Sequence, residues 1–183
     1  YTLVFHDPAG EEVRLESRSV VNAAGLDADV VAALPGLDAA AAGYRQVWTK
    51  GSYFRIRSPL RHLARRLLYP VVPESWGSVL GIHLTVDLDG ELKLGPDAEP
   101  LRERRQEYAV DEGRRDAFLA AARRYLPSLR EDDLSPDQSG IRARLEPRGG
   151  AFRDFVLAEE SARGLPGWVN LVGIESPGLT SCL

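Results

Sequence analysis

The chain has 183 residues, of which 44% are hydrophobic and 27% charged, and these values are typical of a globular protein of one to two domains. The formal net charge of −4 offers no basic footprint for nucleic acid. A single cysteine, Cys182, and three widely separated histidines exclude an internal disulfide and give no spacing for a metal site.

The N-terminal part predicts a hairpin and then a strand–turn–helix unit. Residues 1–5 and 11–16 alternate apolar and polar around HDPAG, which is a turn sequence, so we expect a β-hairpin. Val20 and Val21 then predict a short buried strand, NAAG a turn, and LDADVVAAL a helix closed by Pro35 and Gly36. In α/β folds, strand–turn–helix units of this type bind phosphates and cofactors.

Residues 45–97 read mainly as β-structure. QVWTKGSYFRI alternates, LLYPVVPE is a short extended run, and SVLGIHLTVDLDGELKLGP predicts two strands joined at DLDG. Because side chains alternate along a strand, the first of these two strands has two expected faces: Ile82, Leu84 and Val86 on one, and His83, Thr85 and Asp87 on the other.

The remaining chain predicts one helix and further strands. Residues 111–126 form an amphipathic helix that ends at Pro127, with an apolar stripe of Phe118, Ala121, Ala122 and Tyr125. LREDDLSPDQSG predicts a loop, GIRARLEP and DFVLAEE two strands around a Gly-Gly turn, and GLPGWVNLVGIESPG a strand and turn. The pattern indicates an α+β fold with a mainly antiparallel mixed sheet and flanking helices.

The last turn predicts the start of a helix. Ser176 is expected to be the N-cap and Pro177 the first helical residue, where a missing N–H costs nothing. Gly178 would let a ligand approach the backbone closely. A helix start of this kind suits an anion, but the residues alone favour an ordinary capped helix.

Three further residues keep two interpretations each. His83 is either a solvent-facing histidine or a general base that lines a cleft. Arg142 is either a surface arginine or a residue whose guanidinium binds a carboxylate through two hydrogen bonds. Lys50 is either a strand-end surface charge or a cationic site residue. The phosphate-binding patterns G-x-G-x-x-G and G-x-x-x-x-G-K-[ST] and the nucleophile elbow G-x-S-x-G do not occur.

Several fragments, taken in order, resemble one family. VVNAAGL, KGSYF, LLYPVVP, LGIHLT, SGIRARL, DFVLA and VNLVGIESPGLTS are similar to segments of FAD-dependent oxidoreductases of the D-amino-acid-oxidase-like superfamily. The resemblance is strongest to the L-2-hydroxyglutarate dehydrogenase/oxidase group and spans about Val20 to Thr180. GIESPGLT and GIHLT are its most specific pieces.

The resemblance implies a division of the chain. Residues 1–36 would be a segment of a Rossmann-type FAD-binding domain, 37–163 the substrate-binding, catalytic domain, and 164–183 a truncated segment that returns to the flavin. The nucleotide-binding glycine motif of the family lies at its N-terminus and is absent here. We therefore expect a fragment that is inactive alone and whose FAD is held largely by a domain outside this chain.

The resemblance also implies roles for individual residues. His83 would be the catalytic base and Arg142 would bind the substrate carboxylate, with Lys50, Tyr53 and Thr85 also contacting substrate. The residues implied to bind FAD lie in two groups: Asn22, Ala23, Ala24 and Gly25, and Gly173, Ile174, Glu175, Ser176, Pro177, Gly178, Leu179 and Thr180. The implied reaction is oxidation of a small, 2-hydroxyglutarate-like 2-hydroxy acid, with electrons passing to a quinone-like acceptor or oxygen.

Two other functions stay open at this point. One is an amine or amino-acid oxidase of the glycine or sarcosine type, and the other is a non-enzymatic antiparallel-sheet binding module. The sequence contains no run of 18 apolar residues and no signal-peptide pattern at its start, so we expect no transmembrane segment and no nucleic-acid partner. The expected location is cytoplasmic, either free or peripheral to the membrane.

Overall fold

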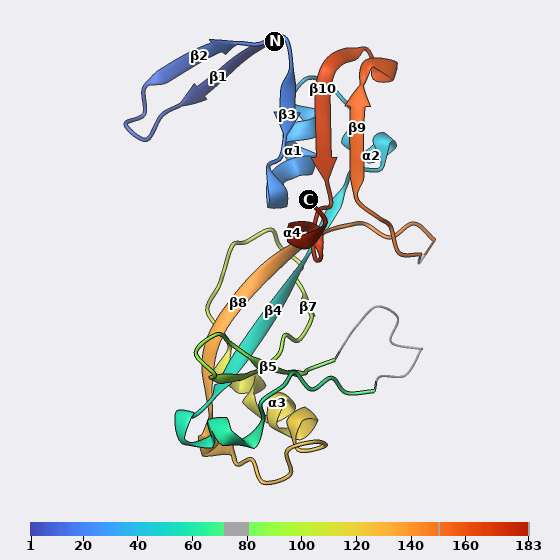
Figure 1. Cartoon of the computed structure of the whole chain (residues 1–183). Helices are drawn as coiled ribbons and strands as arrows, with labels where there is room; N and C mark the ends of the chain where they lie inside the picture. The colour runs from blue at the N-terminus through green and yellow to red at the C-terminus, as the bar shows by residue number, and fades with distance from the viewer. Residues whose placement is uncertain (72–80, 150, 183) are drawn as a thin grey trace. The chain divides into compact units, whose positions relative to one another are not determined.

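The computed structural model describes residues 1–71, 81–149 and 151–182 (Figure 1). The chain divides into two structural units. Unit 1 contains Tyr1–Val47 and Ala143–Leu183, and unit 2 contains Trp48–Arg142. Antiparallel pairing predominates and the helices are short, so the predicted α+β class is confirmed. Among the described helices, none has both the length and the apolar character needed to cross a bilayer.

Unit 1 begins with the predicted hairpin. Strands β1 (Thr2–His6) and β2 (Glu12–Glu16) pair antiparallel, with Val4 opposite Arg14. The turn between them is held by Asp7, whose Oδ1 accepts hydrogen bonds from the backbone N–H groups of Ala9 and Glu11, both at 2.9 Å. This bonding is typical of aspartate at a turn and explains why the prediction from HDPAG is confirmed.

A three-stranded sheet forms the rest of unit 1, in the order β3-β10-β9 (Figure 1). Strand β10 (Leu165–Val172) pairs parallel with β3 (Val20–Asn22) and antiparallel with β9 (Val156–Glu160). The chain continues from β3 into η1 (Gly25–Asp27), α1 (Ala28–Ala33) and α2 (Ala39–Ala42). The buried core of unit 1 consists of Ala28, Ala32, Leu37, Tyr44, Leu145 and Val172.

Two expectations for unit 1 are wrong in detail. Val21 was expected to be buried, but it is 61% exposed. The buried side chain of this short strand is that of the next residue, Asn22. Ser176 is not an N-cap, because helix α4 spans only Gly178–Ser181 and follows Pro177 without a side-chain cap. The backbone N–H of Gly178 donates instead to the carbonyl of Glu175, at 2.6 Å, which closes a turn before the helix begins.

Unit 2 is organised around the long strand β4 (Gln46–Ile56). Strands β5 (Leu84–Val86), β6 (Leu92–Leu94) and β7 (Glu99–Pro100) complete the order β5-β6-β4-β7, and β8 (Leu134–Leu145) also pairs with β4. The helical elements are η2 (Ser58–Leu63), η4 (Glu112–Arg114), α3 (Arg115–Ala122) and η5 (Glu131–Asp133). Phe118 of α3 packs on Phe54 of β4, with ring centroids 4.7 Å apart, in the centre of the apolar core.

The expected loop at 129–140 is largely a strand instead. Residues from Leu134 onward belong to β8, although their sequence is polar. Asp137 pairs with Arg55 at 2.8 Å and with Lys93 at 3.0 Å, so charges on β4 and β6 compensate the aspartate within the sheet. The hairpin at DLDG is confirmed, since Leu84 of β5 stands opposite Leu94 of β6.

The amphipathic helix and the extended run are confirmed over shorter ranges. The regular part of the helix is α3, whose buried residues are Phe118, Leu119 and Ala122, and the turns that follow it reach Tyr125. In the extended run LLYPVVPE, Leu68 exchanges backbone hydrogen bonds with Leu84 at 2.9 and 3.1 Å. Its remainder, from residue 72, lies outside the described residues.

Candidate functional site

Unit 1 brings together the two sequence segments that the resemblance assigns to a cofactor. Asn22 on β3 stands opposite Asn170 on β10 in a parallel pair, so both strands end at the same edge of the sheet. Residues 23–25 leave this edge from β3, and residues 173–180 leave it from β10. Ligands of open α/β sheets bind beyond the carboxyl ends of the strands, which is where both segments lie.

Gln46 connects the two segments at this edge. Its Nε2 donates to the carbonyl oxygens of Gly25 at 2.9 Å and Leu26 at 3.3 Å. Its Oε1 accepts from the backbone N–H of Gly173 at 3.3 Å. The Gln46 backbone N–H donates to Asp29 Oδ2 at 2.9 Å, which fixes the start of β4 against α1. One buried amide therefore binds the turn after β3 and the turn after β10 at the same time.

The glycines of these segments differ in what surrounds them. Gly25 has a φ of +58° and no heavy atom within 4 Å of the position where a Cβ would stand, so its surroundings are open. A Cβ on Gly173, whose φ is +74°, would lie 2.5 Å from Leu145 Cγ, and one on Gly178 would lie 2.5 Å from Ile174 Cγ2. Backbone conformation and packing against the buried Leu145 therefore require glycine at 173, whereas a Cβ at 178 would force the side chain of Ile174 to shift.

The side chains of the two segments fall into buried and exposed sets. Asn22 uses its amide internally, donating to the Ala28 carbonyl at 2.7 Å and accepting from Ala24 N–H at 3.2 Å. Glu175 accepts a hydrogen bond from Arg144 Nε at 2.7 Å. Ile174 and Leu179, by contrast, are 39% and 88% exposed. The edge consequently presents Ile174 and Leu179, together with the exposed Ser176 and Thr180, while Asn22 and Glu175 make hydrogen bonds within unit 1.

A network of buried hydrogen bonds joins the strands that form this edge. Glu160, at the end of β9, is fully buried. Its Oε1 accepts from Tyr44 OH at 2.6 Å and from Asn170 Nδ2 at 2.9 Å, and its Oε2 accepts from Arg163 Nη1 at 2.5 Å. Asn170 Oδ1 in turn accepts from Asn22 Nδ2 at 2.8 Å. This chain of bonds fixes which way each amide points.

The network shifts the pKa values of two of its members. Burial raises the pKa of Glu160, but the hydrogen bonds from Asn170, Tyr44 and Arg163 favour the carboxylate more strongly, so the net pKa is lowered. Burial, together with the neighbouring Glu160 carboxylate, raises the pKa of Tyr44 to about 12. Both groups therefore hold the protonation states that the hydrogen bonds require: an ionised acceptor and a neutral donor.

Unit 2 brings together a second set of residues. His83 directly precedes β5 and is buried, so the solvent-facing interpretation is wrong. Its imidazole stacks on Tyr69, with ring centroids 4.4 Å apart and planes 22° from parallel. His83 Nδ1 lies 3.1 Å from the Gly81 carbonyl oxygen. A carbonyl can only accept, so this bond fixes the proton on Nδ1 and leaves Nε2 as a proton acceptor.

Two nearby residues, Arg142 and Tyr69, influence the phenol of Tyr53 through their charges. Burial raises the pKa of Tyr53, the charge of Arg142 lowers it, and Tyr69 raises it further, with burial as the largest effect. The phenol of Tyr53 therefore lies within electrostatic range of both the guanidinium and Tyr69. Arg142, Tyr53, Tyr69 and His83 form what we call the Arg-His cluster of unit 2.

Lys50 and Thr85, also expected near substrate, have bonds within unit 2. Lys50 is buried, and its Nζ donates to the Ala109 carbonyl at 2.5 Å. Thr85 Oγ1 donates to the Lys93 carbonyl at 3.3 Å across the β5–β6 hairpin. These contacts give both side chains a structural role in the described chain.

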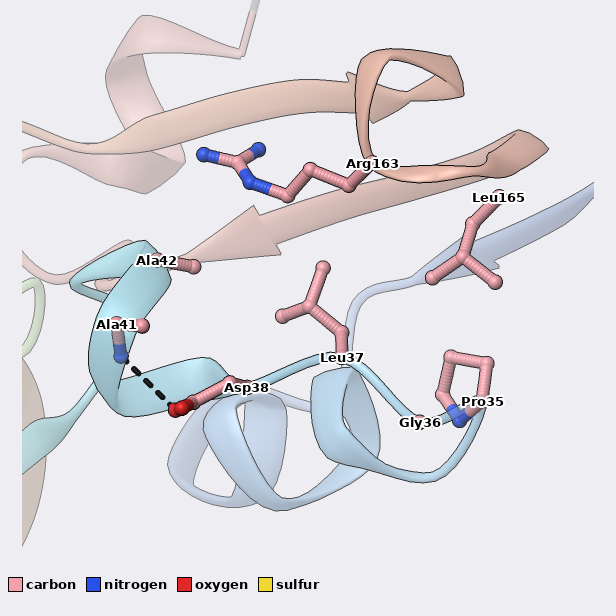
Figure 2. Close-up of a pocket in the computed structure, with 8 residues that line it drawn as sticks. All are labelled: Pro35, Gly36, Leu37, Asp38, Ala41, Ala42, Arg163 and Leu165. Atoms are coloured by element: carbon pink, nitrogen blue, oxygen red, sulfur yellow. Dashed lines mark hydrogen bonds between the residues drawn. The ribbon is translucent and has the colours of Figure 1, made fainter.

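A pocket of about 360 Å³ opens elsewhere in unit 1. Figure 2 shows Asp38, Leu37 and Arg163 around it, with Asp38 Oδ1 capping α2 through Ala41 N–H at 2.9 Å. Arg163 faces the pocket while bonded to Glu160. The lining residues are Pro35, Gly36, Leu37, Asp38, Ala41, Ala42, Arg163 and Leu165, and they include none of the expected site residues.

Sequence reasoning missed Tyr69, Gln46 and Glu160. Tyr69 lies in LLYPVVP, so its place in a quoted segment was the only signal for it. Gln46 is the first residue of a strand and Glu160 the last residue of another. Each forms a hydrogen bond with a residue more than 100 positions away, Gln46 with Gly173 and Glu160 with Tyr44. The sequence itself carries no local signal for such partners.

Comparison with curated proteins gives relatives of known name. The chain is 39% identical to "L-2-hydroxyglutarate dehydrogenase, mitochondrial" of Arabidopsis thaliana, over 96% of this chain and 37% of the relative. It is 28% identical to the protein of that name from Homo sapiens, over 86% of this chain and 40% of the relative. It is 30% identical to "Glycerol 3-phosphate dehydrogenase" of Caloramator mitchellensis, over 91% and 32%. The chain spans well under half the length of these relatives.

Solved structures share the fold. L-α-glycerophosphate oxidase from Mycoplasma pneumoniae, with FAD bound, aligns with a TM-score of 0.70 at 22% identity, over 97% of this chain and 45% of that one. Glycerol-3-phosphate dehydrogenase from Bacillus halodurans, complexed with FAD, aligns with a TM-score of 0.67 at 18% identity, over 95% and 32%. The family described as "DAO: FAD dependent oxidoreductase" matches residues 2–183 of the sequence. The chain belongs to this family of FAD-dependent oxidoreductases.

Proposed function

We propose that this chain is part of an FAD-dependent dehydrogenase or oxidase that oxidises a small, 2-hydroxyglutarate-like 2-hydroxy acid. The observation that carries the proposal is the Arg-His cluster, in which His83 stacks on Tyr69 with its Nδ1 against the Gly81 carbonyl, and Tyr53 feels the charge of Arg142. A 2-hydroxy acid needs one cation for its carboxylate and one base for its hydroxyl proton. The names of several relatives support the same substrate class.

The carboxyl edge of unit 1 has features that fit FAD. Gly25 leaves open space beside the backbone, and the exposed Ile174 and Leu179 offer apolar surface of the kind that a flavin ring covers. We propose that Asn22–Gly25 and Gly173–Thr180 contact the cofactor there. Bound FAD would supply the two-electron acceptor for the α-hydrogen of the substrate.

The proposed work of the protein's own side chains is binding, orientation and proton transfer. The guanidinium of Arg142 binds the substrate carboxylate in two-point fashion, which fixes the orientation of the carbon to be oxidised. His83 accepts the hydroxyl proton at Nε2 and keeps its Nδ1 proton on the Gly81 carbonyl. Stacking on Tyr69 holds the plane of the imidazole during this transfer. Lys50, Tyr53 and Thr85 line the same site in this proposal.

The remaining parts of the proposal concern the whole protein. Residues 1–36 and 164–183 are assigned to the FAD-binding part and 37–163 to the substrate domain. Electrons leave to a quinone-like acceptor or to oxygen. A cytoplasmic location is proposed from the single cysteine, although several relatives are named mitochondrial.

The test uses the full-length gene product. Purified protein is expected to be yellow and to reduce an acceptor dye with L-2-hydroxyglutarate. Sarcosine, glycine and glycerol 3-phosphate serve as competing substrates, the last because of the Caloramator relative. Faster turnover of an amine would replace the proposal with an amino-acid oxidase, and faster turnover of glycerol 3-phosphate would replace the substrate class. A folded, full-length protein without flavin would favour a binding module and contradict the proposal.

A further inference from the structure

We infer that Gln46 is a positioning residue for the cofactor, because it fixes the two FAD-contacting turns relative to each other. The inference rests on the proposed function, which assigns those turns to FAD. Gln46 lies outside both assigned segments, at the first residue of β4. Its place in the sequence gives no reason to expect a role at the carboxyl edge of β3 and β10.

The first step is that each end of the Gln46 side chain binds a different segment. Nε2 donates to the Gly25 carbonyl at 2.9 Å, and Oε1 accepts from Gly173 N–H at 3.3 Å. Gly25 and Gly173 are both in left-handed backbone conformations, with φ of +58° and +74°. The Gly25 carbonyl also accepts the backbone N–H of Ala28, and Gly173 directly follows the last residue of β10, so the amide of Gln46 adds one bond to each turn and joins the two.

The second step is that the amide has only one useful orientation. A flipped amide would set its NH₂ against Gly173 N–H and its oxygen against two carbonyl oxygens. The backbone bond from Gln46 N–H to Asp29 Oδ2, at 2.9 Å, holds the residue in place from its other side. The side chain is also buried, so water does not replace these bonds readily.

The third step is what the connection does for a ligand between the two turns. A flavin that touches both segments needs the two backbones at a fixed separation, and Gln46 sets that separation before the ligand arrives. Preorganisation of this kind lowers the ordering cost of binding. Loss of Gln46 should therefore weaken FAD binding more than it weakens folding.

The test compares Gln46→Met and Gln46→Glu with Tyr44→Phe in the full-length gene product. Met keeps the length of the side chain but offers no amide, and Glu replaces the donor that faces Gly25 with an acceptor. Tyr44→Phe is the matched control, because it also removes a buried hydrogen bond in unit 1, at 2.6 Å to Glu160, but touches neither turn. The measurements are the dissociation constant for FAD, from flavin fluorescence, and the Tm of the apoprotein.

We expect both Gln46 variants to raise the dissociation constant for FAD by about tenfold, as loss of supporting hydrogen bonds does at other cofactor sites, with Tm no lower than in the control. The visible circular dichroism of bound flavin should also change in the Gln46 variants only. Equal FAD affinity in the Gln46 variants and in Tyr44→Phe, at matched Tm, would overturn the inference. If Gln46→Met does not fold, the length-conserving Gln46→Glu decides. Absence of FAD from the wild-type protein would instead refute the proposed function.

Discussion

Asn22 and Asn170 are 148 positions apart in the sequence, yet their side-chain amides share a buried hydrogen bond of 2.8 Å between β3 and β10. Asn170 Oδ1 also accepts from Trp168 Nε1 at 3.1 Å, and its Nδ2 donates to Glu160. Every polar atom of the Asn170 side chain is therefore engaged within unit 1. The pair joins the buried carboxylate of Glu160 to the turn that follows β3.

Asn170→Leu should be strongly destabilising, because it leaves Asn22, Glu160 and Trp168 each short of one buried partner. Each such group costs about 1–3 kcal/mol when it is left unpaired. Urea unfolding would measure the loss. Val21→Thr, on the exposed face of the neighbouring strand, is the control and should change the unfolding free energy by less than about 0.5 kcal/mol. Equal stability of the two variants would contradict the role given to the amide pair.

Glu160→Gln should reduce the acid sensitivity of the fold. The pKa of Glu160 is lowered in the folded chain, so its stabilising contribution is present above the ordinary carboxyl pKa and is lost as the pH falls through the folded value. The variant should be less stable at pH 7, because the glutamine NH₂ would face the donor Nη1 of Arg163, and its stability should fall less steeply below about pH 4. Thermal unfolding from pH 7 to pH 3 checks both effects, with the exposed Glu16→Gln expected to follow wild type.

Arg142→Ala should raise KM for the hydroxy acid and lower kcat/KM on the order of 100-fold, since a misplaced substrate reacts slowly. Arg142→Lys should restore only part of the loss, because an ammonium lacks the two-point geometry of the guanidinium. Steady-state dye reduction by the FAD-loaded, full-length protein measures these constants. Arg55→Ala is the control, since Arg55 pairs with Asp137 on the same sheet. If both alanine variants lose activity equally, Arg142 does not bind the substrate.

His83→Asn should lower kcat by about 10²–10⁴-fold with little change in the dissociation constant for FAD, as expected when a general base is lost. His62→Asn provides the comparison, because His62 is exposed and only its Nδ1 approaches a carbonyl, that of Pro59 at 3.0 Å. Equal kcat values for His83→Asn and His62→Asn would exclude His83 as the base.

Phe118→Ala should destabilise the protein by about 3–5 kcal/mol, the usual cost of removing a buried aromatic ring. Its ring packs against Phe54 at 4.7 Å and is fully buried. Leu88→Ala, in the fully exposed turn between β5 and β6, should change stability by less than about 0.5 kcal/mol. Chemical denaturation of both variants gives the comparison. A small effect at Phe118 would show that the core of unit 2 relaxes around the missing ring.

Local patterns predicted the elements whose reasons are local. The hairpin at residues 1–16 depends on Asp7 within its own turn, and η4, the turn directly before α3, begins where Asp111 accepts from Gly113 N–H at 2.9 Å. Such contacts span a few residues, so the sequence displays them directly. The α+β class followed from the same alternations and turns.

Features that depend on distant partners could not be read in this way. The polar start of β8 looked like a loop, because Arg55 and Lys93, which pair with Asp137, lie on other strands. The strand pattern was compatible with a solvent-facing His83, because Tyr69, whose ring stacks on the imidazole, lies in a separate segment of the sequence. The family resemblance named candidate residues in several segments, but it carried no information on Gln46 or on the Glu160 network.

The parallel pairing of β3 with β10 has a consequence for the order in which the protein is made. Asn170 follows Asn22 by 148 positions, so at a synthesis rate of about 5–20 residues per second it appears on the order of ten seconds later. During that interval β3 has no partner on the side that β10 will occupy, whereas residues 48–142, which form unit 2, are continuous and can fold as they emerge. The carboxyl edge therefore cannot form before β10 has left the ribosome, and a chain released before β10 lacks it.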